Sequence, residues 1–184
     1  ALIHGALSLD LGVEIIWVDA EELEIQEYPK ILECAQGILV PGGFGYRGIE
    51  GKVKAVKFAR ENNIPYLGLC LGMQAMVIEF ARFVFGLKEP NSTEFDPHTP
   101  YPVIDLLDEQ RNVSRMGGTM RLGIYPCYLV PGTKAYQAYG VNLIYERHRH
   151  RYEFNNDFRD ILCSKGLVIS GHSLDGKLVE IVEL

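Results

Sequence analysis

The sequence predicts an α/β protein built on a central, largely parallel sheet that is flanked by helices. Two apolar strand patterns, 37–40 and 65–69, alternate with two helical patterns, 49–62 and 71–86. Strands that alternate with helices are typical of a parallel sheet, because a parallel pair needs a crossover connection. Residues 13–18 read as a further apolar strand ahead of these. In such a sheet, functional residues are expected in the loops at the carboxyl ends of the strands.

The second half of the chain predicts antiparallel strands added to this sheet. Residues 146–154 read as a charged strand, 155–165 as a helix and 167–170 as another strand. Successive strands with short connections usually pair antiparallel. Between the two halves, residues 88–102 read as a long polar loop that contains prolines.

Composition and charge narrow the classes of protein that fit this chain. Its 184 residues carry a net charge of −6, so we expect no nucleic-acid partner. Apolar runs fall short of the roughly 18 residues that a membrane span needs, so we expect no membrane partner. The four cysteines have no C-x-x-C spacing, which predicts a reduced intracellular protein without structural zinc. We expect a cytoplasmic location and no metal site.

Both ends of the sequence resemble cuts through secondary structure. Residues 1–7 read as the later part of a helix without a start signal, and residues 179–184 stop within a strand-like alternation. We therefore expect residues 1–184 to be a single domain, truncated at both ends, from a longer polypeptide.

Cys70 is the main candidate for a catalytic residue. It lies between the strand pattern 65–69 and the helical pattern that follows, bracketed by Gly68 and Gly72. This arrangement is typical of a nucleophile elbow, in which a sharp turn lifts the side chain above the sheet edge. The amides at the start of the helix favour a thiolate and can hold an oxyanion. The alternative to a catalytic role is a structural one, in which the cysteine is a small buried hydrophobic residue. We expect this role for Cys34, Cys127 and Cys163.

The glycine-rich run Pro41–Gly45 follows the other strand and is expected to lie beside Cys70. Its glycines permit a close backbone approach to a ligand. It lacks both the G-x-G-x-x-G spacing and a Gly-Lys-Ser/Thr sequence, so it does not read as a nucleotide loop. A plain turn is the alternative. Beside the elbow, the run could donate one oxyanion amide and Leu71 the other.

Together, Pro41–Gly45 and Gly68–Gln74 resemble the class I (triad-type) glutamine amidotransferases. Four further segments resemble, more narrowly, the glutaminase domains of the CTP synthase family: Asn91–Phe95, Met116–Gly123, Glu146–Glu153 and Val179–Glu183. The resemblance implies a flavodoxin-like fold and the hydrolysis of glutamine to ammonia through a cysteine thioester. It also implies a synthetase domain in the same polypeptide, which uses ATP and magnesium to convert UTP to CTP. No cofactor is implied for the present domain, and a tetramer is implied for the whole protein.

The resemblance assigns roles to individual residues. Cys70 would be the nucleophile, and the backbones of Gly43 and Leu71 would contact the oxyanion or substrate. The residues that would hold the α-amino and α-carboxylate groups of glutamine are Gln74, Glu94 and Arg151. An amino acid is a zwitterion, so its site needs an anion and a cation, and Arg grips a carboxylate in bidentate fashion. The alternatives are an exposed loop carboxylate for Glu94 and a solvated strand face for Arg151.

The general base is the missing part of this constellation. A cysteine amidase of this type needs a histidine and an acid that orients it. The family resemblance places them in a His-Pro-Glu motif beyond Leu184. None of the five histidines here precedes Pro-Glu, and we expect His98, His148 and His150 to be surface or hydrogen-bonded residues.

Two other functions remain open on sequence grounds. One is another hydrolase built on a cysteine elbow, of the γ-glutamyl hydrolase type. The other is a non-catalytic regulatory module that has kept the elbow. The segments that carry Glu94 and Arg151 favour a free amino acid as substrate, and hence the amidotransferase.

Overall fold

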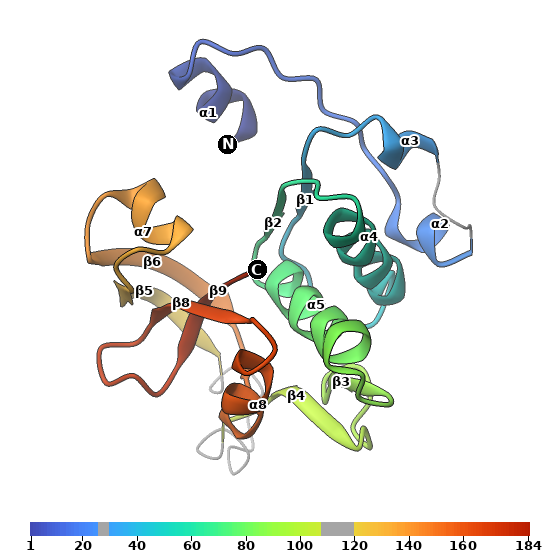
Figure 1. The fold of residues 1–184 in the computed structure, drawn as a ribbon, viewed down its shortest axis with the longest axis vertical. Coiled ribbons are helices and arrows are strands. Elements are labelled where there is room, and N and C mark those ends of the chain that lie inside the picture. Colours follow the sequence, from blue (N-terminus) through green and yellow to red (C-terminus); the bar gives the residue numbers. More distant parts are fainter. Residues whose placement is uncertain (26–29, 108–119) are drawn as a thin grey trace.

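The computed structural model describes residues 1–25, 30–107 and 120–184, and it has the α/β fold that the sequence predicts. Strands β1 (Ile38–Val40) and β2 (Tyr66–Gly68) pair in parallel beside helices α4 (Ile49–Glu61) and α5 (Leu71–Phe80) (Figure 1). Helix α4 is the crossover that a parallel pair requires. The order β1–α4–β2–α5 therefore brings the loops after both strands to the same edge.

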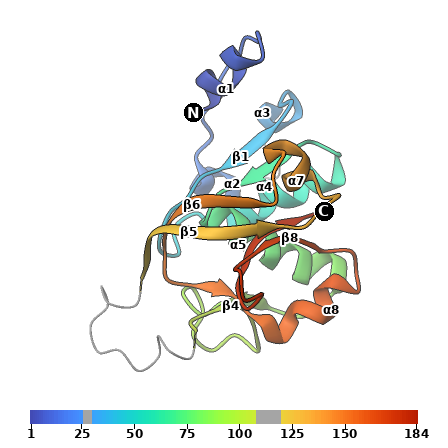
Figure 2. The same cartoon turned by 90° about the vertical axis from the view of Figure 1, so that its left-hand side faces the viewer.

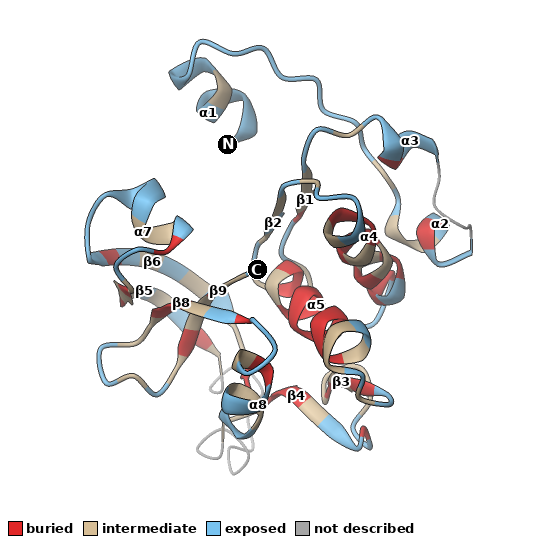
Figure 3. Cartoon of the chain, viewed as in Figure 1, coloured by how far each residue is buried: buried red, intermediate tan, exposed pale blue. Residues whose placement is uncertain are grey.

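Helix α5 lies at the centre of the main hydrophobic core (Figure 3). All of its residues except Met73 are buried, and a helix that is buried on nearly every side is typical of a core position. It continues into a π-helical turn, η1 (Ala81–Phe85), which ends at Gly86 with φ of 86°. The residue at the start of this helix is thus held by a rigid part of the molecule.

A buried ion pair joins α5 to α4. The carboxylate of Glu79 is fully buried and accepts hydrogen bonds from Nε and Nη2 of Arg60 at 2.7–3.1 Å. Removing one partner of a buried pair leaves an uncompensated charge. The pair therefore fixes how the two helices pack.

The second half of the chain forms antiparallel strands, as predicted. Four strands pair in the order β6 (Leu143–His150), β5 (Arg121–Leu129), β8 (Val168–His172) and β9 (Val179–Glu183). The predicted segment 116–123 lies partly outside the described residues, and its described end opens β5.

A small third sheet links the two halves of the chain. It consists of β3 (Pro90–Ser92), β4 (Tyr101–Asp105) and β7 (Glu153–Phe154), with β3 parallel and β7 antiparallel to β4. The prediction of an uninterrupted loop over 88–102 is wrong, since β3 and the start of β4 lie within it. The predicted charged strand 146–154 is divided, because the chain leaves one sheet after His150 and enters another at Glu153.

The remaining elements are short helices: α1 (Leu2–Ser8), α2 (Ala20–Ile25), α3 (Lys30–Glu33), α7 (Lys134–Tyr139), η3 (Asn156–Phe158) and α8 (Arg159–Cys163). Helix α1 lies at the periphery of the molecule (Figure 2), and none of its residues is buried. Among the described residues, no helix is both long and apolar enough to cross a membrane.

Residues 13–18 are not a strand in the structure, so that prediction is wrong. Trp17 is 87% exposed, and Val13, Ile15 and Ile16 are also exposed. A short apolar run forms a strand only where an edge is present to pair with it, and pairing is a property of the tertiary structure. As a result, the described parallel part of the fold is smaller than the sequence predicts.

Candidate active site

Cys70 lies at a strained turn between β2 and α5, as predicted. Its backbone has φ of 53° and ψ of −104°, and it is the residue immediately before the first turn of α5. A residue other than glycine adopts this region at a cost of about 1–3 kcal/mol, and such strain is typical of catalytic positions. The elbow geometry read from the glycine spacing is therefore present.

The glycines around Cys70 are required by close packing. A Cβ atom on Gly72 would lie 2.2 Å from the carbonyl oxygen of Val40, and one on Gly68 would lie 2.5 Å from the carbonyl carbon of Gly72. The hydroxyl of Tyr66 donates a hydrogen bond to the Gly72 carbonyl at 2.8 Å. Strand β2, the elbow and the first turn of α5 are thus locked together.

The Pro41–Gly45 loop lies against the elbow, as expected from the sheet topology. A Cβ atom on Gly42 would lie 3.5 Å from Cβ of Cys70, and one on Gly43 would lie 3.1 Å from Cδ2 of Leu71. At the other end of the loop, the amide of Gly45 donates to Oε1 of Glu94 at 2.8 Å. Glu94 therefore anchors this loop from the β3–β4 connection.

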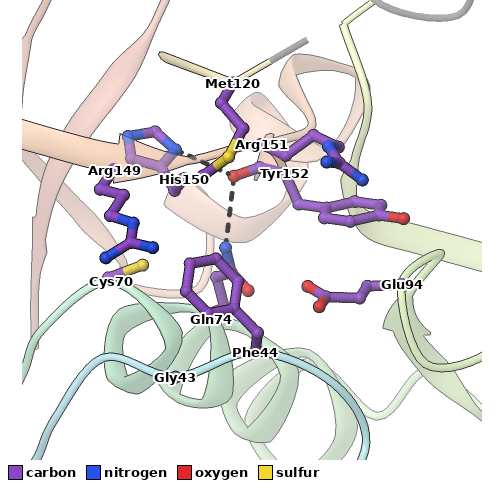
Figure 4. Close-up of a pocket in the computed structure, with 10 residues that line it drawn as sticks. All are labelled: Gly43, Phe44, Cys70, Gln74, Glu94, Met120, Arg149, His150, Arg151 and Tyr152. Carbon is purple, nitrogen blue, oxygen red and sulfur yellow. Dashed lines mark hydrogen bonds between the residues drawn. The ribbon is translucent and has the colours of Figure 1, made fainter. Parts of the chain in front are cut away.

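A cavity of about 340 Å³ opens beside Cys70. Its lining residues are drawn in Figure 4: Gly43, Phe44, Cys70, Gln74, Glu94, Met120, Arg149, His150, Arg151 and Tyr152. The structure thus brings Glu94 and Arg151 together beside Cys70, although Glu94 lies in the β3–β4 connection and Arg151 in the link between β6 and β7. This convergence is as predicted, and the size is that of a small-molecule site.

Gln74 presents an unsatisfied acceptor in this cavity. The side chain is 5% exposed, and its Nε2 donates to the Tyr152 carbonyl at 3.2 Å. Its Oε1 is buried and has no hydrogen-bond partner among the described residues. Figure 4 shows this oxygen and the Glu94 carboxylate directed into the cavity. Two neighbouring acceptors in a cavity are suited to a cationic donor.

Burial and the backbone act in opposite directions on the Cys70 thiol. Burial raises the pKa of Cys70, and the carboxylates of Glu94 and Glu153 raise it further, whereas the Leu71 amide lowers it. The expected contribution of the helix amide is present, but the net pKa shift is upward. A thiolate at neutral pH therefore requires a base or cation beyond these groups.

The other three cysteines do not lie at a helix N-terminus beside the cavity. Cys127 is buried and Cys163 is partly buried, but Cys34 is exposed, so the prediction of a buried residue is wrong for Cys34. Burial raises the pKa of Cys127 to about 11 and also raises the pKa of Cys163. None of the three lines the described cavity.

His150 lines the cavity, which the sequence did not indicate. Its Nε2 lies 2.8 Å from Nδ1 of His148, and its Nδ1 lies 3.3 Å from the Tyr152 carbonyl. Burial lowers the pKa of His150 to about 4. With both ring nitrogens engaged and a low pKa, His150 is a hydrogen-bonded residue rather than the base, as predicted for it. His98 is exposed, as expected.

Sequence reasoning also missed Phe44, Met120, Arg149 and Tyr152 as lining residues. Phe44 lies within the predicted Pro41–Gly45 run and Arg149 within the predicted segment Glu146–Glu153. The Arg149 guanidinium lies over the Phe44 ring at 5.9 Å. Met120 and Tyr152 also lie in segments that carry the family resemblance, Met116–Gly123 and Glu146–Glu153, but no role was assigned to either residue.

A polar cluster lies behind the cavity. The guanidinium of Arg121 donates to both carboxylate oxygens of Glu180 at 2.8 and 3.2 Å and to Glu153 at 3.2 Å. Ligand atoms of His148, His150 and Glu180 lie within 4.8 Å of one another, a spacing that a metal ion could use. Arg121 already supplies the positive charge that Glu180 needs, so these groups form a hydrogen-bonded ion-pair network.

Glu153 makes the stability of the protein depend on pH. Burial raises the pKa of Glu153 to about 7 from 4.5, so the folded state favours its neutral form. That stabilisation is present at low pH and is lost as the pH rises through about 7. We expect Glu153→Gln to gain up to roughly 3 kcal/mol relative to the parent between pH 5 and pH 8. Urea unfolding at several pH values measures this, and parallel pH profiles of the two proteins would contradict it.

The whole chain, residues 1–184, matches the family model for class-I glutamine amidotransferases, and the chain belongs to this family. Individual relatives point to a narrower group within this family, the CTP synthases. CTP synthases of Carboxydothermus hydrogenoformans and Geobacillus kaustophilus are 63% and 56% identical over 184 residues, which is the full chain. The chain spans about a third of their length, 34% and 35% respectively.

A solved structure shows the same relationship. The glutaminase domain of Trypanosoma brucei CTPS with bound acivicin is 41% identical and superposes with a TM-score of 0.89, covering 98% of this chain and 71% of that one. This match confirms the predicted fold class and the narrower resemblance to glutaminase domains of CTP synthases.

Proposed function

We propose that this chain is the glutaminase domain of a CTP synthase and that Cys70 hydrolyses L-glutamine. The observation that carries the proposal is the cavity at the elbow, which combines a nucleophile with an anionic and a cationic side chain. Glu94 and Gln74 Oε1 suit the α-ammonium group, and Arg151 suits the α-carboxylate. A free amino acid needs both charges to be met at once.

The reaction follows from this placement. The Cys70 thiolate attacks the side-chain amide carbon of glutamine, and the amides of Leu71 and Gly43 stabilise the resulting oxyanion. The carbon–nitrogen bond breaks, and the nitrogen takes up a proton and leaves as ammonia. Water then attacks the γ-glutamyl thioester, the carbon–sulfur bond breaks, and glutamate and the thiol are released.

The upward pKa shift of Cys70 requires a partner base. We propose that this base and its orienting acid are the His and Glu of the His-Pro-Glu motif that family resemblance places after Leu184. His150 is unsuited to the role, because both of its ring nitrogens are engaged within the described structure.

In CTP synthases, the ammonia released from glutamine is used to aminate UTP. We propose that it passes to a synthetase domain of the same polypeptide, where ATP and magnesium support the amination of UTP to CTP. The remaining expectations, a tetrameric whole protein in the cytoplasm and no cofactor in this domain, belong to the same proposal.

The alternatives predict different behaviour in one assay. In the complete polypeptide, we expect hydrolysis of free glutamine to exceed that of γ-glutamyl peptides, because the site neutralises an unsubstituted amino acid. The rate of glutamate release from the two substrates measures the preference. A preference for γ-glutamyl peptides would support the γ-glutamyl hydrolase type, and absence of hydrolysis of both would support a regulatory module.

A further inference from the structure

The main-chain carbonyl of Tyr152 accepts hydrogen bonds from two side chains of the cavity. Nε2 of Gln74 donates from α5 at 3.2 Å, and Nδ1 of His150 lies 3.3 Å away at the end of β6. Figure 4 shows both contacts converging on one oxygen. This carbonyl therefore connects the helix that carries the nucleophile with the strand that leads to Arg151.

The position of this carbonyl along the chain makes it important. Arg151 and Tyr152 form the short link between β6 of the four-stranded sheet and β7 of the three-stranded sheet. No sheet ladder of the described residues includes this link. Side-chain hydrogen bonds to the Tyr152 carbonyl thus fix a segment whose backbone, unlike that of the strands on either side, is outside the sheet hydrogen bonding.

The same contacts determine the orientation of each polar group. A carbonyl only accepts, so Nδ1 of His150 carries the hydrogen, and Oε1 of Glu153, 3.3 Å away, is a second acceptor for it. In the neutral ring Nε2 then accepts from Nδ1 of His148 at 2.8 Å. Burial lowers the pKa of both histidines, which keeps the rings neutral at pH 7. On the opposite side, donation by Nε2 of Gln74 leaves its Oε1 turned to the cavity.

We propose that His150 is a positioning residue for the substrate zwitterion, acting through the Tyr152 carbonyl. By holding this carbonyl, His150 fixes the link that presents Arg151 to the α-carboxylate. It also fixes the acceptor that orients Gln74 Oε1 toward the α-ammonium group. This inference rests on the proposed glutaminase function, and it adds a residue that acts through a main-chain carbonyl.

Three substitutions in the complete polypeptide test this role. In His150→Asn, the amide nitrogen takes the place of Nδ1 and retains the bond to the carbonyl. In His150→Gln, the amide nitrogen takes the place of Nε2, and in His150→Ala both are lost. We expect the KM for glutamine to rise about tenfold or more in the Gln and Ala variants. The kcat should stay within about threefold, and the Asn variant should stay close to the parent in both.

His172→Ala is the matched control. His172 is a partly buried histidine whose Nδ1 bonds to the Ser173 carbonyl at 2.7 Å, in β8 and away from the cavity lining. The His172→Ala variant should have an unchanged KM for glutamine. Ammonia-dependent CTP formation should be unchanged in every variant, which would show that each variant is folded.

An unchanged KM in His150→Gln and His150→Ala would overturn the inference, as would a His150→Asn variant as impaired as His150→Ala. If the parent hydrolyses glutamine and Cys70→Ala does not, these results bear on His150 alone. If the parent fails to hydrolyse glutamine, the proposed function fails and this inference is overturned with it.

Discussion

Replacement of Cys70 by alanine in the complete enzyme is expected to reduce glutamine hydrolysis by at least about 10³-fold, because no other group can form the thioester. The strained elbow presents this sulfur to the cavity, and the other cysteines of the chain do not line it. CTP formation from added ammonia should continue, since ammonia bypasses the glutaminase site. Steady-state assays with glutamine and with an ammonium salt measure the two activities.

Cys34→Ala is the control for this experiment. Cys34 is exposed and is not among the residues that line the cavity, so its loss should leave both activities unchanged. Substantial glutamine-dependent activity in Cys70→Ala would show that a different group is the nucleophile.

The second large effect is expected for Arg151→Ala. Loss of the guanidinium leaves the α-carboxylate of bound glutamine without a partner in a cavity that already contains Glu94. Truncating one partner of a buried charge pair costs about 2–5 kcal/mol, which corresponds to a rise in the KM for glutamine of about 30-fold or more. Arg151→Lys should fall between the two, because Lys keeps the charge and loses the bidentate geometry.

Arg147→Ala provides the matched comparison. Arg147 is an exposed arginine of the same strand, β6, and it is not among the residues that line the cavity. It should not change the KM for glutamine. Equal damage by Arg151→Ala to glutamine-dependent and ammonia-dependent CTP formation would instead make Arg151 a structural residue.

Local sequence signals were sufficient to predict the elbow. The Gly68–Cys70–Gly72 spacing between an apolar strand and an apolar helix predicts the turn, and the close contacts of both glycines explain why their type is needed. Family resemblance, rather than residue spacing, linked Glu94 to Arg151. Their convergence depends on β3, β4 and the β6–β7 link meeting at one cavity, which no local pattern encodes.

The incorrect predictions have the same origin. Residues 13–18 have the apolar composition of a strand, but whether they form one depends on pairing with an edge elsewhere in the molecule. His150 was expected to be a surface or hydrogen-bonded residue, and it is hydrogen-bonded, but its place in the cavity lining was not predicted. The chain leaves one sheet after His150 and enters another at Glu153, and this change brings four consecutive residues, Arg149 to Tyr152, to one cavity.

The central claim is that Cys70 is a nucleophile in a site for glutamine, and selective labelling tests it most directly. The complete protein is treated with acivicin, the compound bound in the trypanosome glutaminase domain, and the modified peptides are identified by mass spectrometry. The predicted result is one adduct, on Cys70, whose formation is slowed by added glutamine. Labelling of the exposed Cys34 at a comparable rate, or labelling of Cys70 that glutamine does not slow, would contradict the claim.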